Sequence, residues 1–208
     1  KTLLLDRLGV TGEDRLLLAK VLDRARQAQD RNIPSATDFL SPQQRMLALD
    51  LLRLAGIPET SYLTSGGYDG AERTVILFLP DWLDAENAAE ELPIRCLRAV
   101  FRAEDHLNHR DFLGALMGAG ISRESVGDIC VGSGSCDFFV TAEIAPYVEQ
   151  NFESAGRTKL RLERIGLDQV CVPEPETKEI RDTLASLRLD SVISTGFRIG
   201  RSLAAQYV

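Results

Sequence analysis

The sequence predicts an α+β protein with a helical N-terminal unit, a ferredoxin-like middle domain and a short helical C-terminal module. Apolar residues recur at helical spacing in the first 56 residues, strand and helix patterns alternate through the middle, and two amphipathic segments lie after residue 187. We expect domains at 1–70, 71–170 and 188–208, with a linker at 171–187. A chain of 208 residues, 44% of them hydrophobic, is long enough to bury a core.

The N-terminal unit is expected to be a helical hairpin over residues 1–56. Thr11 is placed to cap a helix that runs to about Gln29, because acidic residues and an apolar stripe follow it. The segment 32–34 contains a proline and breaks this helix. A second helix starts at Ser41, with proline in its first turn, and ends near Gly56. The apolar faces of the two helices are expected to pack on each other.

The middle domain shows the order strand, helix, strand, strand, helix, strand. The predicted ranges are 94–101, 109–117, 127–131, 137–141, 142–152 and 158–164. This order is the ferredoxin-like arrangement that RNA recognition motifs (RRM-like domains) also use. The glycine-serine segment 132–135 is expected to be a hairpin turn, because no Gly-Lys-Ser or Gly-Lys-Thr follows to make a phosphate-binding loop. The buried run 74–79, which Pro80 ends, is expected to add an extra strand at the edge of this sheet.

The helix that begins at residue 109 carries candidate binding residues. Asn108 is expected to cap it together with Asp111, while Gly114 and Gly118 share a face and would allow close packing against the sheet. His109 and Arg110 in the first turn, with Arg123 in the loop beyond the helix, form a candidate anion site. Side chains and free backbone N–H groups at the start of a helix can together face an anion. The alternative is that Asn108 and Asp111 only cap the helix and that the arginine after it pairs with a nearby acid.

The last residues carry a second candidate site. Apolar spacing predicts two short helices around a turn at Gly196 or Gly200. The segments 188–190, Arg-Leu-Asp, and 201–205, Arg-Ser-x-x-Ala, resemble the opening of an S4 domain, with Gly200 where a serine is usual. The strands of such a domain would follow Val208, so the module is expected to be truncated. The resemblance implies that this module binds RNA through Arg188, Arg198, Arg201 and Ser202.

The most distinctive stretch reads H-R-D-F-L-G-A-L over 109–116, then G-I-x-R-E-x-x-G-D-I over 120–129. Together with the C-terminal segment it resembles the YlmH-like family of bacterial RNA-binding proteins. That resemblance implies a non-catalytic factor that binds RNA, ribosomal RNA or tRNA, on the large ribosomal subunit during rescue of stalled translation. No cofactor is implied.

Composition narrows the classes of function. The net charge of −7 argues against general binding to nucleic acid, yet residues 154–208 carry nine Lys or Arg against seven Asp or Glu. A locally basic end suits a protein that engages one RNA site. No apolar run is long enough to cross a bilayer and no signal peptide is recognised, so we expect a cytoplasmic monomer that does not contact membranes. The cysteines show no metal-ligand spacing and are expected to be reduced packing residues, at Cys96, Cys130, Cys136 and Cys171.

The middle sheet offers charges but few aromatics. Arginines at 95, 98 and 102 and basic residues at 159, 161 and 164 are expected on adjacent strands, where they form either a solvated mixed-charge face or an RNA platform. Of Phe138 and Phe139, one at least must point inward, so readout by base stacking is disfavoured and phosphate contacts are expected.

Two other functions are kept open. An RNA-modifying enzyme would use His109 and Asp111 as an acid-base pair, but positions i and i+2 of a helix point apart. The Arg-Leu-Asp of residues 188–190 echoes the catalytic motif of pseudouridine synthases without its flanking glycine and threonine, and Asp190 is expected to cap a helix instead. A protein-recruiting scaffold is the third reading.

Overall fold

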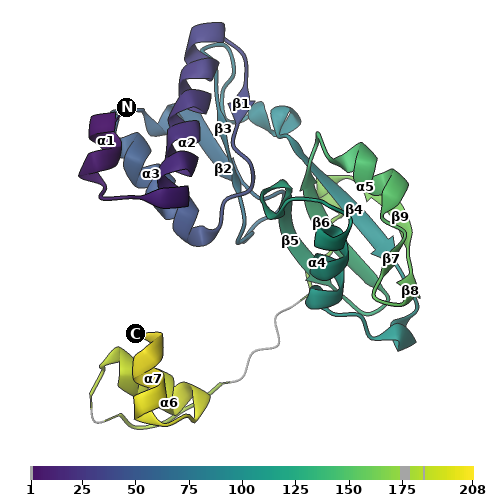
Figure 1. Ribbon diagram of the computed structural model, residues 1–208. Helices are drawn as coiled ribbons and strands as arrows, with labels where there is room; N and C mark the ends of the chain where they lie inside the picture. Colours follow the sequence, from purple (N-terminus) through teal and green to yellow (C-terminus); the bar gives the residue numbers. More distant parts are fainter. Residues whose placement is uncertain (1, 174–178, 185) are drawn as a thin grey trace. The chain divides into compact units, whose positions relative to one another are not determined.

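The computed structural model describes residues 2–173, 179–184 and 186–208. The chain divides into two compact units, one up to Pro173 and one from residue 174 onward (Figure 1). The described residues of the first unit form three sheets, of three, four and two strands, and five of the α-helices named below.

The N-terminal part of the first unit packs three helices on a small sheet. The helices are α1 (Thr2–Arg7), α2 (Gly12–Arg31) and α3 (Pro42–Leu54), and the strands are β1 (Ser35–Ala36), β2 (Tyr62–Ser65) and β3 (Val75–Phe78). Leu18, Leu51 and Leu52 are fully buried between α2, α3 and β3. A reciprocal cap starts α3: the Gln44 N–H donates to Ser41 Oγ at 3.2 Å, and the Ser41 N–H donates to Gln44 Oε1 at 2.9 Å. The two predicted helices are confirmed, whereas α1, β1 and β2 were not predicted.

The expectation of an extra strand at the edge of the middle sheet is wrong. β3 is the central strand of a separate antiparallel sheet with the order β1-β3-β2. Its four residues, Val75 to Phe78, are all buried, because helices cover one face and the second sheet covers the other. A strand buried on both faces reads as a continuous apolar run, which does not reveal its partners.

The middle part has the predicted ferredoxin-like order. Its elements are β4 (Ile94–Val100), α4 (His109–Gly118), β5 (Val126–Val131), β6 (Ser135–Thr141), α5 (Ala145–Asn151) and β9 (Arg161–Ile165), with a small hairpin of β7 (Ser154–Ala155) and β8 (Thr158–Lys159). The antiparallel sheet has the order β5-β6-β4-β9, so β4 and β9 are neighbours as expected. The predicted strand 158–164 is split at Leu160, whose N–H donates to Glu153 O at 2.8 Å.

Both faces of this four-stranded sheet are covered. Phe138 points to the side of α4 and α5 and lies in the core with Phe112 and Leu116. Phe139 points to the other side and packs with Val75, Leu77 and other residues of the first sheet. Each phenylalanine has 0% of its surface exposed. The first sheet therefore occupies the face that an RNA recognition motif would leave open.

The second unit is a pair of short helices, α6 (Leu189–Phe197) and α7 (Arg201–Ala204), drawn in yellow in Figure 1. The helix pair was predicted. α6 continues through Gly196 and ends at Phe197, its C-cap Arg198 has a left-handed φ of 54°, and Gly200 is the N-cap of α7, so of the two predicted turn positions Gly200 is confirmed. The Ser194 hydroxyl donates to Ile199 O at 2.7 Å and fixes the turn. The described residues between Cys171 and Leu187 contain no helix.

Candidate nucleic-acid interface

The predicted C-terminal arginines meet on one carboxylate. Arg188 Nε lies 3.2 Å from Asp190 Oδ1, and Arg201 Nη2 lies 3.0 Å from Asp190 Oδ2. The two arginine side chains remain 74% and 64% exposed, whereas the Asp190 side chain is only 16% exposed. Arg201, and then Arg188, lowers the pKa of Asp190 from its ordinary value of 3.8. The carboxylate thus aligns two cations from two helices and leaves them open to an anion.

The expectation that Asp190 caps a helix is wrong. The N-cap position of α6 is Arg188, and no side chain caps that end. Arg198 and Ser202 are exposed, at the end of α6 and the start of α7. The unit therefore brings all four predicted residues onto two short helices and the turn that joins them.

The start of α4 has the predicted cap. Asn108 Oδ1 accepts from the Arg110 N–H at 2.9 Å, and Asp111 Oδ2 accepts from the Asn108 N–H at 2.9 Å. His109 and Arg110 are exposed. Their side chains form no ion pair within the described residues. They are therefore accessible to a partner, while Asp111 has a structural function.

Arg123 lies away from His109 and Arg110. It lies in a 3₁₀ turn, Arg123–Ser125, beyond the far end of α4, which is about 15 Å long at 1.5 Å per residue. Its guanidinium is half-buried and donates to Val126 O at 2.6 Å and Gly127 O at 3.2 Å. Burial lowers the pKa of Arg123. The expectation that Arg123 clusters with His109 and Arg110 is therefore wrong. The alternative, an ion pair between Arg123 and a nearby acid, is not observed either, because its guanidinium binds backbone carbonyls.

Arg123 belongs to a polar network between the two sheets. Arg73 donates to Phe39 O at 3.0 Å, to Arg123 O at 3.1 Å and to Val126 O at 2.9 Å. Asp128 accepts from the Tyr68 hydroxyl at 2.8 Å and from the backbone N–H groups of residues 72 and 73 at 2.7 and 3.1 Å. These bonds satisfy polar groups that would otherwise be unpaired in the seam, the partly buried region where the first sheet packs on the four-stranded sheet.

The same seam is closed by apolar contacts. Tyr68 stacks on Phe139 with ring centroids 5.2 Å apart. A Cβ added at Gly127 would lie 2.6 Å from the Phe39 ring, so only glycine fits there. Burial and the hydrogen bond to Asp128 raise the pKa of Tyr68. Phe138 and Phe139 of the sheet are thus buried and not exposed to RNA bases, which agrees with the expectation that base stacking is disfavoured.

Two of the predicted sheet arginines, Arg98 and Arg164, project from opposite faces of the sheet, and each is engaged by a carboxylate. Arg98 binds Asp137 through two hydrogen bonds of 2.7 Å and donates to Gln169 O at 3.0 Å. Asp137 accepts in addition from the Cys171 N–H at 2.9 Å. Arg164 makes a bidentate pair with Glu149 at 2.7 and 2.9 Å. These arginines hold the protein together and are not free for phosphate.

Close packing of Gly114 and Gly118 against the sheet is not observed. Both are exposed, and a Cβ at either would meet no atom within 4 Å. Gly114 instead lines an open groove of about 630 Å³ between α4 and the β7–β8 hairpin. Sequence reasoning missed Arg157 beside this groove, although a basic residue directly after a turn glycine was a usable signal.

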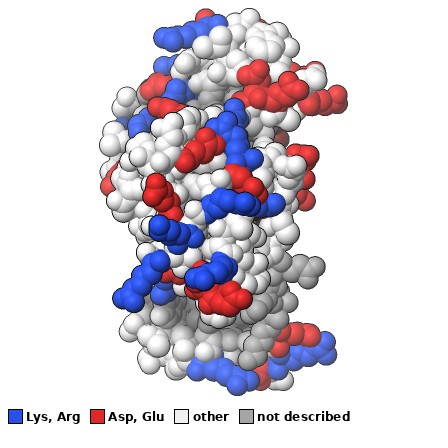
Figure 2. Space-filling view, turned by 90° about the vertical axis from the view of Figure 1, so that its right-hand side faces the viewer, with Lys and Arg blue, Asp and Glu red and all other residues white. Residues whose placement is uncertain are grey.

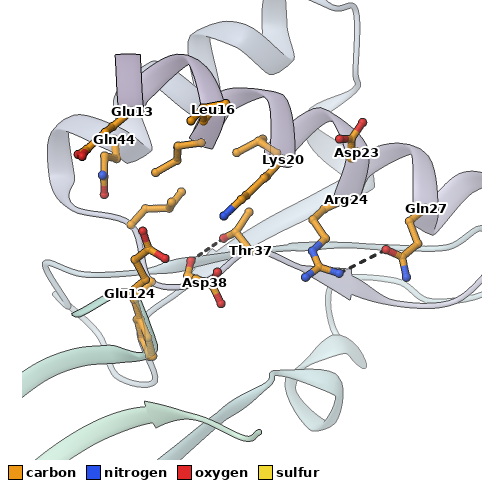
Figure 3. A pocket seen from close by; sticks show the side chains of 14 residues that line it. Glu13, Leu16, Lys20, Asp23, Arg24, Gln27, Thr37, Asp38, Gln44 and Glu124 are labelled. Carbon is orange, nitrogen blue, oxygen red and sulfur yellow. Dashed lines mark hydrogen bonds between the residues drawn. The ribbon is translucent and has the colours of Figure 1, made fainter. Parts of the chain in front are cut away.

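A second cavity, of about 580 Å³, lies between α2 and the segment 37–40 (Figure 3). Lys20 and Arg24 reach toward it, and so do acidic side chains that include Asp38 and Glu124. Because both signs line it, this cavity has no clear preference for an anion. Figure 2 likewise shows Lys and Arg mixed with Asp and Glu over one face of the molecule.

Two further features were sought in the described residues. These residues contain no group of three His, Cys, Asp or Glu side chains suited to a metal ion, and none of their helices is both long and apolar enough to cross a membrane. Cys96 and Cys136 are buried as expected, whereas Cys171 is exposed and was wrongly assigned to packing.

Comparisons with known proteins agree with this architecture. Residues 13–81 match the family model "YlmH, N-terminal", and residues 103–169 match "Putative RNA-binding domain in YlmH". A solved structure, "Cell division protein ylmH from Streptococcus pneumoniae", superposes with a TM-score of 0.63 over 77% of this chain and 95% of that chain, at 21% identity. This likeness shows a shared fold.

A relative from Bacillus subtilis, "Ribosome-associated protein quality control protein P2", is 31% identical over 189 residues. The match covers 91% of this chain and 72% of the relative. The two family models and this relative confirm the resemblance found in the sequence: the chain belongs to the YlmH family.

Proposed function

We propose that this protein is a non-catalytic factor that binds ribosomal RNA or tRNA on the large ribosomal subunit, in quality control of stalled translation. The observation that carries the proposal is the Arg188–Asp190–Arg201 arrangement, in which one carboxylate orients two exposed arginines. Paired guanidinium groups suit phosphate oxygens. The name of the B. subtilis relative, which refers to ribosome-associated quality control, supports the choice of partner.

A catalytic role for His109 and Asp111 has no support from the local geometry. Asp111 Oδ2 accepts the Asn108 N–H at 2.9 Å, so this carboxylate serves the helix cap. Two positions on a helix that are two residues apart do not face each other. If the protein is incubated with ribosomal RNA and the RNA is digested to nucleosides, we expect unchanged nucleoside masses. Pseudouridine has the mass of uridine, so the digest is also separated by chromatography; a new nucleoside in either assay would overturn the non-catalytic assignment.

Binding is tested by co-sedimentation with isolated bacterial large subunits over a range of salt concentrations. Arg188→Ala and Arg201→Ala are each expected to weaken binding and to flatten the slope of log affinity against log salt by about one unit. Arg181→Ala is the matched control, because Arg181 is exposed in the same unit and pairs with Glu179 at 2.6 Å. Equal binding by all three variants and the unsubstituted protein would refute the assignment.

A further inference from the structure

The middle domain has no open sheet face, so RNA must reach it elsewhere. Phe138 lies under the helices and Phe139 under the first sheet, and neither has exposed surface. Arg98, on the same face as Phe139, is bound to Asp137. Resting on the RNA-binding function proposed above, we infer that an RNA backbone lies in the groove between α4 and the β7–β8 hairpin, on the helical side of this domain.

Small residues form the floor of this groove. Gly114, Ala115 and Ala119 of α4 line one side, and Ser154 and Gly156 of the hairpin line the other. Gly156 approaches α4 closely, since a Cβ there would lie 3.9 Å from Asp111 Oδ1. At Gly114 a Cβ would meet nothing within 4 Å, so a partner can come against the helix itself. A ribose-phosphate chain needs such clearance.

Three basic residues lie in the lining of the groove or next to it along the hairpin. Arg110 lines it, Arg157 directly follows the lining residue Gly156, and Lys159 is paired across the hairpin with the lining residue Ser154. Residues opposite each other in an antiparallel pair project from the same face. All three are exposed, and none forms an ion pair within the described residues. They are the cations of this domain that remain free for phosphates, together with Arg161 on β9.

The clustering is not a result of overall composition. Residues 103–169 contain six Lys or Arg against eleven Asp or Glu, yet three of the six, at 110, 157 and 159, lie in the lining of the groove or next to it. Two acids also line it, Asp111 and Glu153. Asp111 accepts a hydrogen bond in the helix cap, so Glu153 is the carboxylate that faces an incoming phosphate without a competing role.

The predicted contacts are with phosphate and ribose, so they do not discriminate between base sequences. On duplex DNA, each phosphate contact contributes about 0.9 to the slope of log affinity against log salt concentration, and we use the same value for duplex RNA. One such contact therefore changes affinity roughly eight-fold between 1 M and 0.1 M salt. Removing Arg157 and Lys159 together should therefore lower affinity at 0.1 M salt by about 10- to 60-fold.

The test measures binding of the 208-residue chain to isolated bacterial large subunits and to protein-free 23S ribosomal RNA. The charge variant is Arg157→Gln with Lys159→Gln, and the steric variant is Gly114→Gln, which fills the groove without changing charge. Arg26→Gln on α2 is the control, because Arg26 is exposed and far along the chain from the groove. Glu153→Gln should tighten binding by a few fold, since it removes a carboxylate that repels phosphate. Circular dichroism melting verifies that each variant folds.

The outcomes separate this inference from the proposed function. If the unsubstituted chain binds neither probe, the RNA-binding function fails. If it binds and both groove variants match the Arg26→Gln control, the function stands and the groove assignment is wrong. If the groove variants lose binding to subunits but not to protein-free RNA, the groove contacts a ribosomal protein and the inference is likewise overturned.

Discussion

Asp137 is expected to be the most costly carboxylate to remove from the described residues of the first unit. It lies on β6 with a side chain that is 2% exposed, and it accepts two hydrogen bonds of 2.7 Å from Arg98 and one of 2.9 Å from the Cys171 N–H. Arg98 also donates to Gln169 O, so this pair fastens the segment after β9 to the sheet. Asp137→Ala removes three of these bonds at once.

The magnitude follows from what remains after the substitution. Removing one partner of a buried ion pair typically costs about 3–5 kcal/mol, because the other charge is left without compensation. Arg98 is 24% exposed, so water can partly solvate it, and the lower end of that range applies. We therefore expect Asp137→Ala to lower the free energy of unfolding by about 3 kcal/mol.

Urea unfolding followed by circular dichroism measures this loss. The control is Glu149→Ala, which breaks the bidentate pair with Arg164 on the surface, where the two side chains are 30% and 47% exposed. Exposed pairs contribute about 0–1 kcal/mol, so the control should change stability little. A loss below about 1 kcal/mol for Asp137→Ala, equal to the control, would refute the reasoning from burial.

Two further predictions concern glycines and thiols. Gly127→Ala forces a Cβ against the Phe39 ring and should lower the free energy of unfolding, measured in urea, by about 1–3 kcal/mol. Gly114→Ala, on the open side of α4, should raise the free energy of unfolding by up to about 1 kcal/mol. A change of the same sign in both variants would contradict the packing described. In the folded protein at pH 8, the exposed Cys171 should be the one thiol of the four that reacts rapidly with a disulfide reagent. Burial raises the pKa of the Cys96 thiol to about 12, and it also raises the pKa values of the Cys130 and Cys136 thiols. Two or more rapidly reacting thiols would count against this assignment.

The sequence predicted elements that are specified by neighbours along the chain. Helical spacing of apolar residues located α2, α3 and α4, and the Asn108–Asp111 cap was visible because both residues lie at the helix start. Strand order in the middle domain followed from the succession of elements. Each of these depends on local pattern or on a topology that few alternatives satisfy.

The errors arose where distant residues decide. The two residues of β1 carry too little pattern to be read as a strand, so the partner of β3 could not be found and β3 was assigned to the wrong sheet. Arg123 looks like a free surface cation in the sequence. Its carbonyl acceptors, on residues 126 and 127, are only three and four residues further along the chain. Arg73, which binds the Arg123 carbonyl, is distant in the sequence and is brought there by the packing of the two sheets. Gly114 looks like a packing glycine, since periodicity cannot tell whether another element covers that face.

A net charge of −7 is compatible with RNA binding because several acids are engaged by neighbouring groups of the protein. Asp137 binds Arg98, Asp128 binds a tyrosine and two backbone N–H groups, and Asp190 aligns the C-terminal arginines. A carboxylate held in this way adds less repulsion at an open surface than its formal charge suggests, because its neighbours compensate it. The field that a phosphate meets depends on exposed side chains within about 10 Å at 0.1 M salt. Counting charges over the chain therefore predicts solubility, whereas the unpaired cations beside a groove predict where RNA can bind.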